Sequence, residues 1–180
     1  MRREIRLAGF GGQGIILAGH ILGKAAALYD NKDAVLSQSY GPEARGGACA
    51  AEVVISDEPV DYPLFDKADI VVVMSLEAST KYGPTVKDGG TVLVDSDLAR
   101  SNAEGPNIHS APFTRTAEGL GNRMAANVVM LGFLTGVTGV VSREAMEESV
   151  RTSVRPRFVE LNLKAFARGY ELAKEPEAVR

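Results

Sequence analysis

The sequence GFGGQGIILAG, residues 9–19, follows the short, mainly apolar stretch 5–8 and decides how the chain begins to fold. The glycines Gly9, Gly11 and Gly14 have the spacing G-x-G-x-x-G and lie between a strand pattern and an apolar helical pattern. This order predicts a strand–turn–helix unit. Glycines let such a turn approach a ligand closely, and the free N–H groups at the start of the helix attract an anion. The sequence therefore predicts a phosphate-binding turn, although the same glycines would also serve a helix that only packs tightly on a sheet.

The composition is that of a soluble protein with its own core, since 45% of the 180 residues are hydrophobic and 24% are charged. We expect one domain over residues 1–174, followed by a frayed tail over residues 175–180. The formal net charge of −3 argues against nucleic-acid binding. Residues 124–142 lack charge but include polar and glycine positions, so we interpret most of them as a buried helix and do not expect membrane insertion.

Cysteine and histidine are scarce in this chain, which has one Cys and two His. The single cysteine, Cys49, cannot form an intramolecular disulfide, and this favours a cytoplasmic protein. One Cys and two widely spaced histidines, His20 and His109, also exclude a self-contained iron–sulfur cluster or an ordinary zinc site. We expect Cys49 to be a small buried residue and His20 to be a packing residue of the first helix.

Strand patterns alternate with helical patterns in the first part of the chain, and helices fill the last third. The run IVVVM, residues 70–74, has no polar alternation, which is typical of a central strand buried on both faces. This order predicts an α/β protein with three layers, a largely parallel sheet, a Rossmann-like first strand–helix turn and C-terminal helices. The expected strands are 3–8, 34–37, 48–56, 70–74, 91–95 and 107–110. The expected helices are 15–29, 117–137, 142–153 and 158–174. Residues 75–81 are expected to form a short helix or a turn, and residues 87–90 a turn.

A dinucleotide is the first ligand that the glycine spacing suggests. A dinucleotide site needs an acidic side chain about 20 residues further on, at the end of the second strand, to bind the ribose. Asp30 and Asp33 lie near that spacing, but both precede the expected second strand. The sequence therefore favours another phosphate-bearing ligand, and a stand-alone NAD-binding or redox-sensing module stays as the alternative.

A second glycine cluster lies in QSYGPEARGGACAAEVVIS, residues 38–56, between two expected strands. Arg45 precedes Gly46 and Gly47, and a guanidinium can bind two oxygens of a phosphate or carboxylate at once. A local ion pair between Arg45 and Glu43 fits the pattern equally well.

These two segments, together with DYPLFDKADIVVVM (61–74) and RMAANVVMLGFLTG (123–136), resemble the gamma subunit of 2-oxoacid:ferredoxin (acceptor) oxidoreductases. The resemblance spans about residues 3–173 and is greatest to the 2-oxoglutarate and 2-oxoisovalerate branches of this pyruvate/ketoisovalerate oxidoreductase family. It implies an enzyme that converts a 2-oxoacid, coenzyme A and oxidised ferredoxin to an acyl-CoA, carbon dioxide and reduced ferredoxin. The favoured oxoacid is 2-oxoglutarate.

The resemblance also implies that the chain is inactive alone and carries no catalytic residue. Thiamine diphosphate would lie between alpha and beta subunits, the iron–sulfur clusters would lie on other chains, and a ferredoxin-like delta subunit or ferredoxin would take the electrons. The isolated chain could also form a homodimer through a face that partners normally cover. A purely structural assembly role is a third interpretation. The residues that the resemblance assigns to coenzyme A are Gly11, Gly12, Gln13, Gly14, Arg45, Gly46 and Gly47.

Polar residues elsewhere are candidates for either a binding role or a structural role. One group recurs at helical spacing and would form a strip that faces a ligand or another subunit, or would cap and solvate a helix. The other group follows the ends of two expected strands, the edge where α/β proteins bind ligands, and would also serve as helix caps. The first group is Asn122, Arg123 and Asn127. The second group is Ser75, Glu77 and Asp95.

Overall fold

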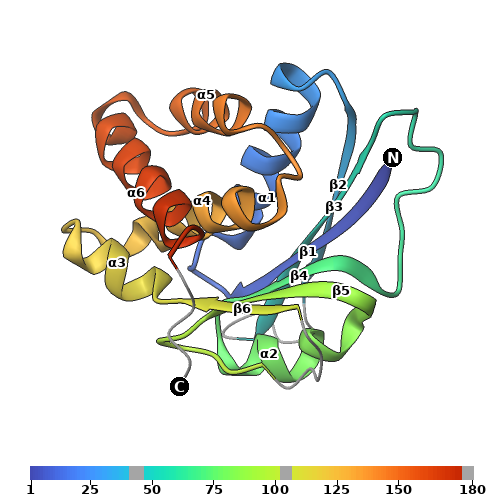
Figure 1. Ribbon diagram of the computed structural model, residues 1–180, viewed down its shortest axis with the longest axis horizontal. Helices are drawn as coiled ribbons and strands as arrows, with labels where there is room; N and C mark the ends of the chain where they lie inside the picture. The colour runs from blue at the N-terminus through green and yellow to red at the C-terminus, as the bar shows by residue number, and fades with distance from the viewer. Residues whose placement is uncertain (41–46, 102–106, 176–180) are drawn as a thin grey trace.

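The computed structural model describes residues 1–40, 47–101 and 107–175, and it shows a twisted sheet with helices on both faces (Figure 1). The strands in these ranges are β1 (Arg2–Phe10), β2 (Asp33–Tyr40), β3 (Ala48–Ser56), β4 (Ala68–Val73), β5 (Val86–Asp95) and β6 (Ile108–Ala111). They form one sheet in the order β2-β3-β1-β4-β5-β6. β1, β4, β5 and β6 are parallel neighbours, whereas β3 runs antiparallel to both β1 and β2.

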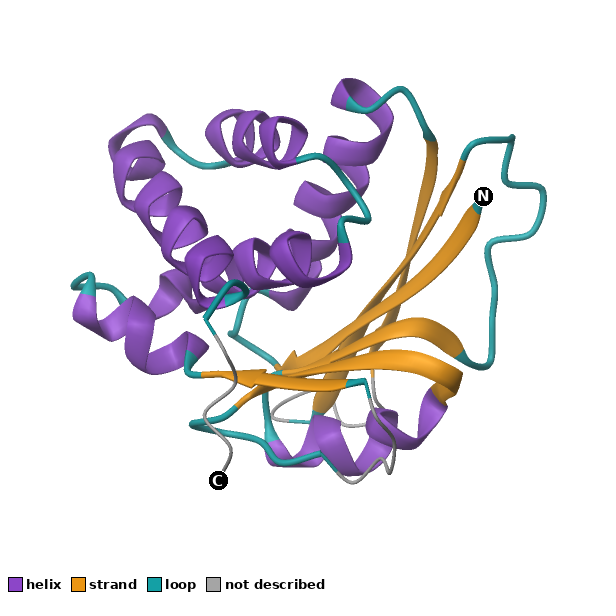
Figure 2. Ribbon diagram, viewed as in Figure 1, coloured by secondary structure: helices purple, strands orange, loops and turns teal. Residues whose placement is uncertain are grey.

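The helices form the two outer layers. The α-helices are α1 (Ile15–Lys24), α2 (Leu76–Tyr82), α3 (Phe113–Gly119), α4 (Ala126–Thr138), α5 (Arg143–Ser153) and α6 (Val159–Leu172). Figure 2 shows α1, α4, α5 and α6 on one face of the sheet and α2 on the other. Shorter helical segments are the π-helix Ala25–Tyr29 and the 3-10 turns Gly83–Thr85, Arg123–Ala125 and Pro156–Phe158.

The central strand β4 explains why helices cover both faces. Its Ile70 and Val72 pack into the core with α1 and α4, whereas Val71 and Val73 pack on the opposite face with Ala78 of α2. A run of β-branched residues without polar alternation needs an apolar layer on each side. The expected buried strand is therefore confirmed, as is the three-layer α/β fold with a mainly parallel sheet and C-terminal helices.

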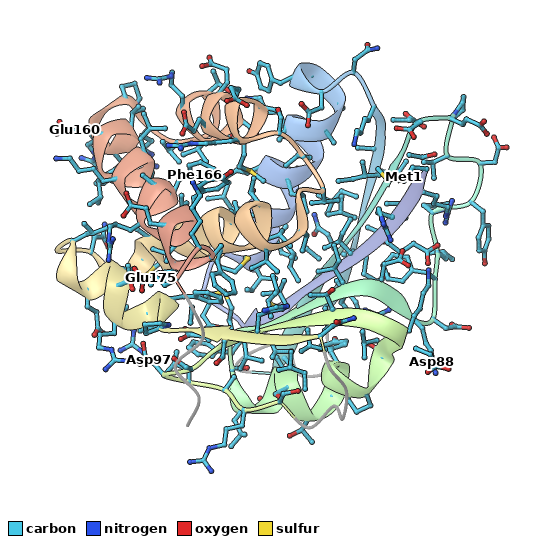
Figure 3. The ribbon with its side chains drawn as sticks, in the orientation of Figure 1. Met1, Asp88, Asp97, Glu160, Phe166 and Glu175 are labelled. Carbon is cyan, nitrogen blue, oxygen red and sulfur yellow. The ribbon has the colours of Figure 1, made fainter. Side chains whose placement is uncertain are left out.

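Glycines bring α4 and α6 into close contact. A Cβ at Gly132 of α4 would collide with the carbonyl oxygen of Phe166, and a Cβ at Gly169 of α6 would collide with that of Val129. Phe166 is fully buried and points into the helical layer, whereas Glu160 on the same helix faces outward (Figure 3). This contact fixes the position of α6 along α4.

The expected helix over residues 117–137 is wrong, because the chain forms two helices there. α3 ends at Gly119, Gly121 adopts a φ of 90°, and α4 begins at Ala126. A positive φ is readily open to glycine, and the Asn122 side chain then starts the 3-10 turn by accepting a hydrogen bond from a backbone amide two residues on. No helix in the described part of the chain is long and apolar enough to cross a bilayer.

Two smaller differences concern element ends. The helix expected over residues 15–29 is α-helical only as far as Lys24 and finishes as a π-helix. The turn expected over residues 87–90 lies within β5, where Gly89 has a φ of 73° and the pairing with β4 shifts in register. A glycine that relieves a local irregularity within a strand gives the same sequence signal as a turn.

Candidate functional site

The turn over residues 11–14, here called the glycine turn, joins the end of β1 to the start of α1 (Figure 1). It lies next to the end of β4, where the Met74 amide donates a hydrogen bond to the Ala8 carbonyl oxygen at 2.9 Å. In open α/β sheets, ligands bind outside the carboxyl ends of the strands. The fold therefore places this turn at the edge where a ligand is expected.

The Gln13 side chain is engaged within the fold. Its Oε1 accepts a hydrogen bond from the Phe10 amide at 2.9 Å, and its Nε2 donates one to the Met74 carbonyl oxygen at 2.8 Å. The Gln13 amide also donates to the Phe10 carbonyl oxygen at 3.2 Å. Gln13 therefore holds the glycine turn in shape, and a contact between its side chain and a ligand stays a prediction.

Gly11 and Gly12 are the open part of the glycine turn. Both are exposed, and a Cβ at either position would meet no atom within 4 Å. Their amides donate to no acceptor in the part of the chain that the structure describes. Gly12 has a φ of 98°, a conformation that residues with a side chain rarely adopt. The two glycines thus leave backbone N–H groups available to a ligand.

The start of α1 adds a favourable field for an anion. Its N-cap is Gly14, with a φ of 72° and no capping side chain, and no acidic residue lies in the first turn of the helix. The positive end of the helix dipole is therefore not neutralised by the helix itself. Asn127 of α4 fixes this end by donating from Nδ2 to the Gly14 carbonyl oxygen at 3.1 Å. A Cβ on Gly14 would lie 2.5 Å from that nitrogen, so the site requires glycine.

Two hollows flank the glycine turn, and Met124, which is 64% exposed, borders both. The larger cavity, of about 430 Å³, lies between the starts of α1 and α4 and the α5–α6 connection. The smaller cavity, of about 140 Å³, reaches from the end of β1 to the start of α3. The larger cavity is lined by Gly14, Leu17, Asn122, Met124, Ala125, Asn127, Val128, Ser153, Val154, Arg155, Phe158 and Asn162. The smaller cavity is lined by Phe10, Gly12, Gln13, Thr114, Arg123, Met124 and Ala126.

The second glycine cluster is described only at its end. Arg45 and Gly46 lie outside the described residues, whereas Gly47 is a half-buried bend before β3. The strand register pairs Ala48 with Phe10, the last residue of β1, and β2 ends beside the start of β3. The strands that precede and follow this cluster therefore reach the same sheet edge as the glycine turn.

The polar residues expected to form one helical strip instead gather around the glycine turn from two elements. Asn122 caps the 3-10 turn, and Asn127 is buried on α4; both border the larger cavity. Arg123 borders the smaller cavity and forms an exposed ion pair with Glu118 at 3.5 Å. The break before α4 explains why they share a site but not a helix face.

The polar residues at the end of β4 are hydrogen-bonded within the fold. Ser75 Oγ accepts a hydrogen bond from the Ala78 amide at 3.1 Å and caps α2. Glu77 accepts one from the Ala48 amide at 3.2 Å and thereby connects α2 to the start of β3. The structure thus shows structural roles for both residues.

Asp95 is fully buried at the end of β5. Its Oδ2 accepts hydrogen bonds from Thr114 Oγ1 at 2.6 Å and from the Thr114 amide at 3.2 Å, and its Oδ1 accepts one from the Asp97 amide at 3.1 Å. Burial raises the pKa of the Asp95 carboxyl, and the hydrogen bonds from Thr114 and Asp97 oppose that rise. Asp95 therefore fixes the start of α3, where Thr114 borders the smaller cavity.

The acids that a dinucleotide site would need have other contacts. Asp30 accepts hydrogen bonds from the Ser142 amide at 2.6 Å and from its Oγ at 2.5 Å, and Asp33 accepts one from the Val60 amide at 2.6 Å. Asp33 begins β2, at the sheet end opposite the glycine turn, and the antiparallel β3 separates β2 from β1. Neither acid lies where a ribose next to the glycine turn would be bound.

Cys49 is buried in β3 with a free thiol, and burial raises the pKa of that thiol, as expected for a packing residue. The expectation for His20 is wrong, because it is exposed on α1. The adjacent Gly19 faces the sheet and lets α1 approach β3, so His20 turns outward. Within the described ranges, no group of three or more His, Cys, Asp or Glu side chains could hold a metal ion.

Sequence reasoning missed the residues that the C-terminal part of the chain contributes. Arg155, Phe158 and Asn162 border the larger cavity from the α5–α6 connection and α6. No local motif marks them, because only the packing of α6 on α4 brings them to the glycine turn.

Comparison with known proteins supports the resemblance. Residues 4–172 match the family described as pyruvate ferredoxin/flavodoxin oxidoreductase. The chain is 57% identical to the 2-oxoglutarate synthase subunit KorC of Methanocaldococcus jannaschii, over 97% of this chain and 96% of that protein. The crystal structure of a keto/oxoacid ferredoxin oxidoreductase gamma subunit from Geobacter sulfurreducens superposes with a TM-score of 0.89 at 46% identity, over 97% of each chain.

A larger protein shares the fold. The 2-oxoglutarate:ferredoxin oxidoreductase from Magnetococcus marinus, with 2-oxoglutarate, coenzyme A and succinyl-CoA bound, has a TM-score of 0.81 at 23% identity, over 99% of this chain and 32% of that one. The family match and the identities above extend over nearly the whole sequence. The chain therefore belongs to the pyruvate ferredoxin/flavodoxin oxidoreductase family, as a gamma-type subunit of a 2-oxoacid:ferredoxin oxidoreductase.

Proposed function

We propose that this chain holds coenzyme A beside the active centre of a 2-oxoacid:ferredoxin oxidoreductase, and that the oxoacid is 2-oxoglutarate. The relative from M. jannaschii is named as a 2-oxoglutarate synthase subunit, which supports the choice of oxoacid. The relative from M. marinus, which shares the fold, contains coenzyme A and succinyl-CoA.

The glycine turn carries the proposal. The amides of Gly11 and Gly12 are exposed and unused by the described residues, and the α1 N-terminus beside them has no acidic cap. Backbone N–H groups at a helix N-terminus bind phosphate groups well. The diphosphate of coenzyme A would lie on this turn, and the Arg45 guanidinium with Gly46 and Gly47 would complete the anion site.

The chemistry of the proposed reaction explains why positioning is sufficient. The oxoacid loses carbon dioxide, its acyl group is transferred to the coenzyme A thiol, and two electrons pass to ferredoxin. Holding the thiol next to the acyl carbon converts a bimolecular encounter into a local one. This chain would supply that orientation, while thiamine diphosphate and iron–sulfur clusters on partner subunits supply decarboxylation and electron transfer.

The proposed assembly contains alpha and beta subunits that bind thiamine diphosphate, and a ferredoxin-like delta subunit or ferredoxin that accepts electrons. A single unpaired cysteine fits a cytoplasmic setting for this assembly. In isolation, the exposed apolar side chains around the glycine turn would favour self-association. These side chains belong to Phe10, Leu17, Leu76 and Met124.

A charge placed on the glycine turn tests the proposal. Gly11 has open space for a side chain and no positive φ, so Gly11→Glu and its neutral control Gly11→Gln should both fold. In the assembled enzyme, we expect Gly11→Glu to raise the KM for coenzyme A about tenfold or more, because a carboxylate repels the diphosphate. Gly11→Gln should raise it much less, and the KM for the oxoacid should not change.

The second glycine cluster offers an independent arm of the same test. Arg45→Ala should also raise the KM for coenzyme A by removing a charged hydrogen bond to phosphate. If Gly11→Glu and Gly11→Gln raise the KM for coenzyme A equally, or if neither changes it, the turn is not an anion site.

A further inference from the structure

The larger cavity has the size and lining of a ligand site. Its volume of about 430 Å³ lies within the range of about 300–1,000 Å³ that is usual for small-molecule pockets. Leu17, Val128 and Phe158 give it an apolar lining that includes an aromatic ring. Leu17 is 42% exposed, which leaves this apolar surface accessible.

Polar groups without partners accompany this apolar lining. Asn127 is only 4% exposed, and its Nδ2 donates to Gly14, yet its Oδ1 receives no hydrogen bond from the described residues. Within the same ranges, Asn162 uses its Nδ2 on the Phe158 carbonyl oxygen and leaves its Oδ1 open. Asn122 uses its Oδ1 on a backbone amide and leaves its Nδ2 open. These open asparagine atoms can form hydrogen bonds with a molecule bound in the cavity.

The rim of the cavity is basic. The exposed Arg155 guanidinium forms no ion pair or hydrogen bond within the described part of the chain. Lys24 adds a second positive charge, since its Nζ lies 3.4 Å from Ser153 Oγ on the same rim. Among the described residues that line the cavity, none is acidic. A free guanidinium beside an ammonium group favours a phosphate group.

We propose that the larger cavity binds the adenosine 3′-phosphate end of coenzyme A, with the adenine on Leu17 and Phe158 and the 3′-phosphate on Arg155. This inference rests on the proposed function, which places the diphosphate on the glycine turn. The unpaired asparagine atoms provide both a donor and acceptors, which match the mixed hydrogen-bonding edge of adenine.

The arrangement of the two cavities also sets the direction of the bound molecule. Gly14 borders the larger cavity and Gly12 the smaller one, so the glycine turn lies between them. The adenosine 3′-phosphate is the bulkier end of coenzyme A and requires the larger cavity. The narrow pantetheine arm then follows the smaller cavity past Thr114 and carries the thiol along the carboxyl edge of the sheet.

The assembled enzyme with coenzyme A and 3′-dephospho-coenzyme A as alternative substrates tests this assignment. Arg155→Ala should raise the KM for coenzyme A about tenfold or more and leave the KM for 3′-dephospho-coenzyme A unchanged. Inhibition by adenosine 3′,5′-bisphosphate should weaken by a similar factor. The control is Arg151→Ala, because Arg151 is an exposed α5 residue outside the cavity lining that pairs with Glu148 at 3.2 Å, and it should leave both KM values unchanged.

A comparison of Arg155→Ala with Gly11→Glu separates the cavity proposal from the proposed function. If Gly11→Glu raises the KM of both substrates and Arg155→Ala acts on coenzyme A alone, both proposals hold. If Gly11→Glu acts but Arg155→Ala changes both substrates equally, or neither, the cavity assignment is wrong and the turn assignment stands. If Gly11→Glu changes neither KM, the proposed function itself is wrong.

Discussion

Asp95 illustrates how a single buried carboxyl shapes the edge of the site. It is fully buried, and it accepts two hydrogen bonds from Thr114 at the start of α3. A buried carboxyl prefers its neutral form, and this explains why its pKa is raised. The same group that fixes Thr114 beside the smaller cavity therefore makes local stability depend on pH.

The sign of this dependence follows from proton binding. Because the pKa of Asp95 is raised in the folded state, the folded protein binds more protons than the unfolded chain between the two pKa values. The stability that Asp95 contributes is complete below its unfolded pKa of about 3.9 and is lost as the pH rises through its folded pKa. We expect the unfolding free energy of the wild type, relative to Asp95→Asn, to fall as the pH rises from about 4 to 7 in urea titrations.

Asp57 provides a control with the opposite sign. The N-terminal ammonium group hydrogen-bonds to its carboxylate at 2.7 Å and lowers the pKa of Asp57. The advantage of the wild type over Asp57→Asn should therefore be complete above about pH 4 and should decrease as the pH falls below that value. A parallel pH response of the two variants would contradict the assignment for Asp95.

At the scale of elements, the contact between α4 and α6 determines whether the larger cavity exists. Gly132 and Gly169 let the two backbones approach, and this approach brings Phe158 and Asn162 to face the start of α1. Close backbone packing of this kind has no room for an added methyl group.

Gly169→Ala should accordingly destabilise the chain by about 3 kcal/mol, because its Cβ would collide with the Val129 carbonyl oxygen and force α6 away from α4. Gly119→Ala is the matched control, since a Cβ on this α3 glycine meets nothing within 4 Å, and it should change stability by less than about 1 kcal/mol. Thermal denaturation of the isolated chain measures both effects. Equal melting temperatures for the two variants would contradict this account of the helix contact.

Local signals explain which elements and site residues were predictable. The glycine turn and the IVVVM strand were predictable because their spacing and β-branched run act within a few residues. The helix break at Gly121 and the strand irregularity at Gly89 were not predictable, because a glycine at these positions fits a helix interior, a turn or a strand equally well. The place of Arg155 and Phe158 in the site was also not predictable, since only tertiary packing brings them to the larger cavity.

At the scale of the whole molecule, the edge of the sheet that holds the proposed site also carries exposed apolar side chains. The exposed apolar residues near the carboxyl ends of β1 and β4 lie at a strand end, in a turn or at a helix start; they are Phe10, Leu17, Leu76 and Met124. Apolar side chains that surround a proposed substrate site fit a surface that other subunits cover. The proposed active centre would therefore be completed by assembly.

The purified chain alone should show no 2-oxoglutarate-dependent reduction of ferredoxin, and activity should appear when the partner subunits are added. The reason is that, in the proposed function, this chain positions coenzyme A while partner subunits supply the decarboxylating cofactor and the electron carrier. Ferredoxin reduction can be followed by absorbance, with a heat-denatured sample of the chain as the control. Turnover by the purified chain alone would show that the assignment of chemistry to partner subunits is wrong.

The anchoring of the glycine turn has a consequence for the order of events during assembly. Gln13 attaches the turn to the backbone of β1 and β4, and Asn127 attaches it to α4, so its geometry is set when the chain folds. The conformational entropy of ordering this loop is lost before any ligand arrives. We therefore expect the turn to be ready to bind pyrophosphate or a free nucleotide weakly before the chain joins the larger complex.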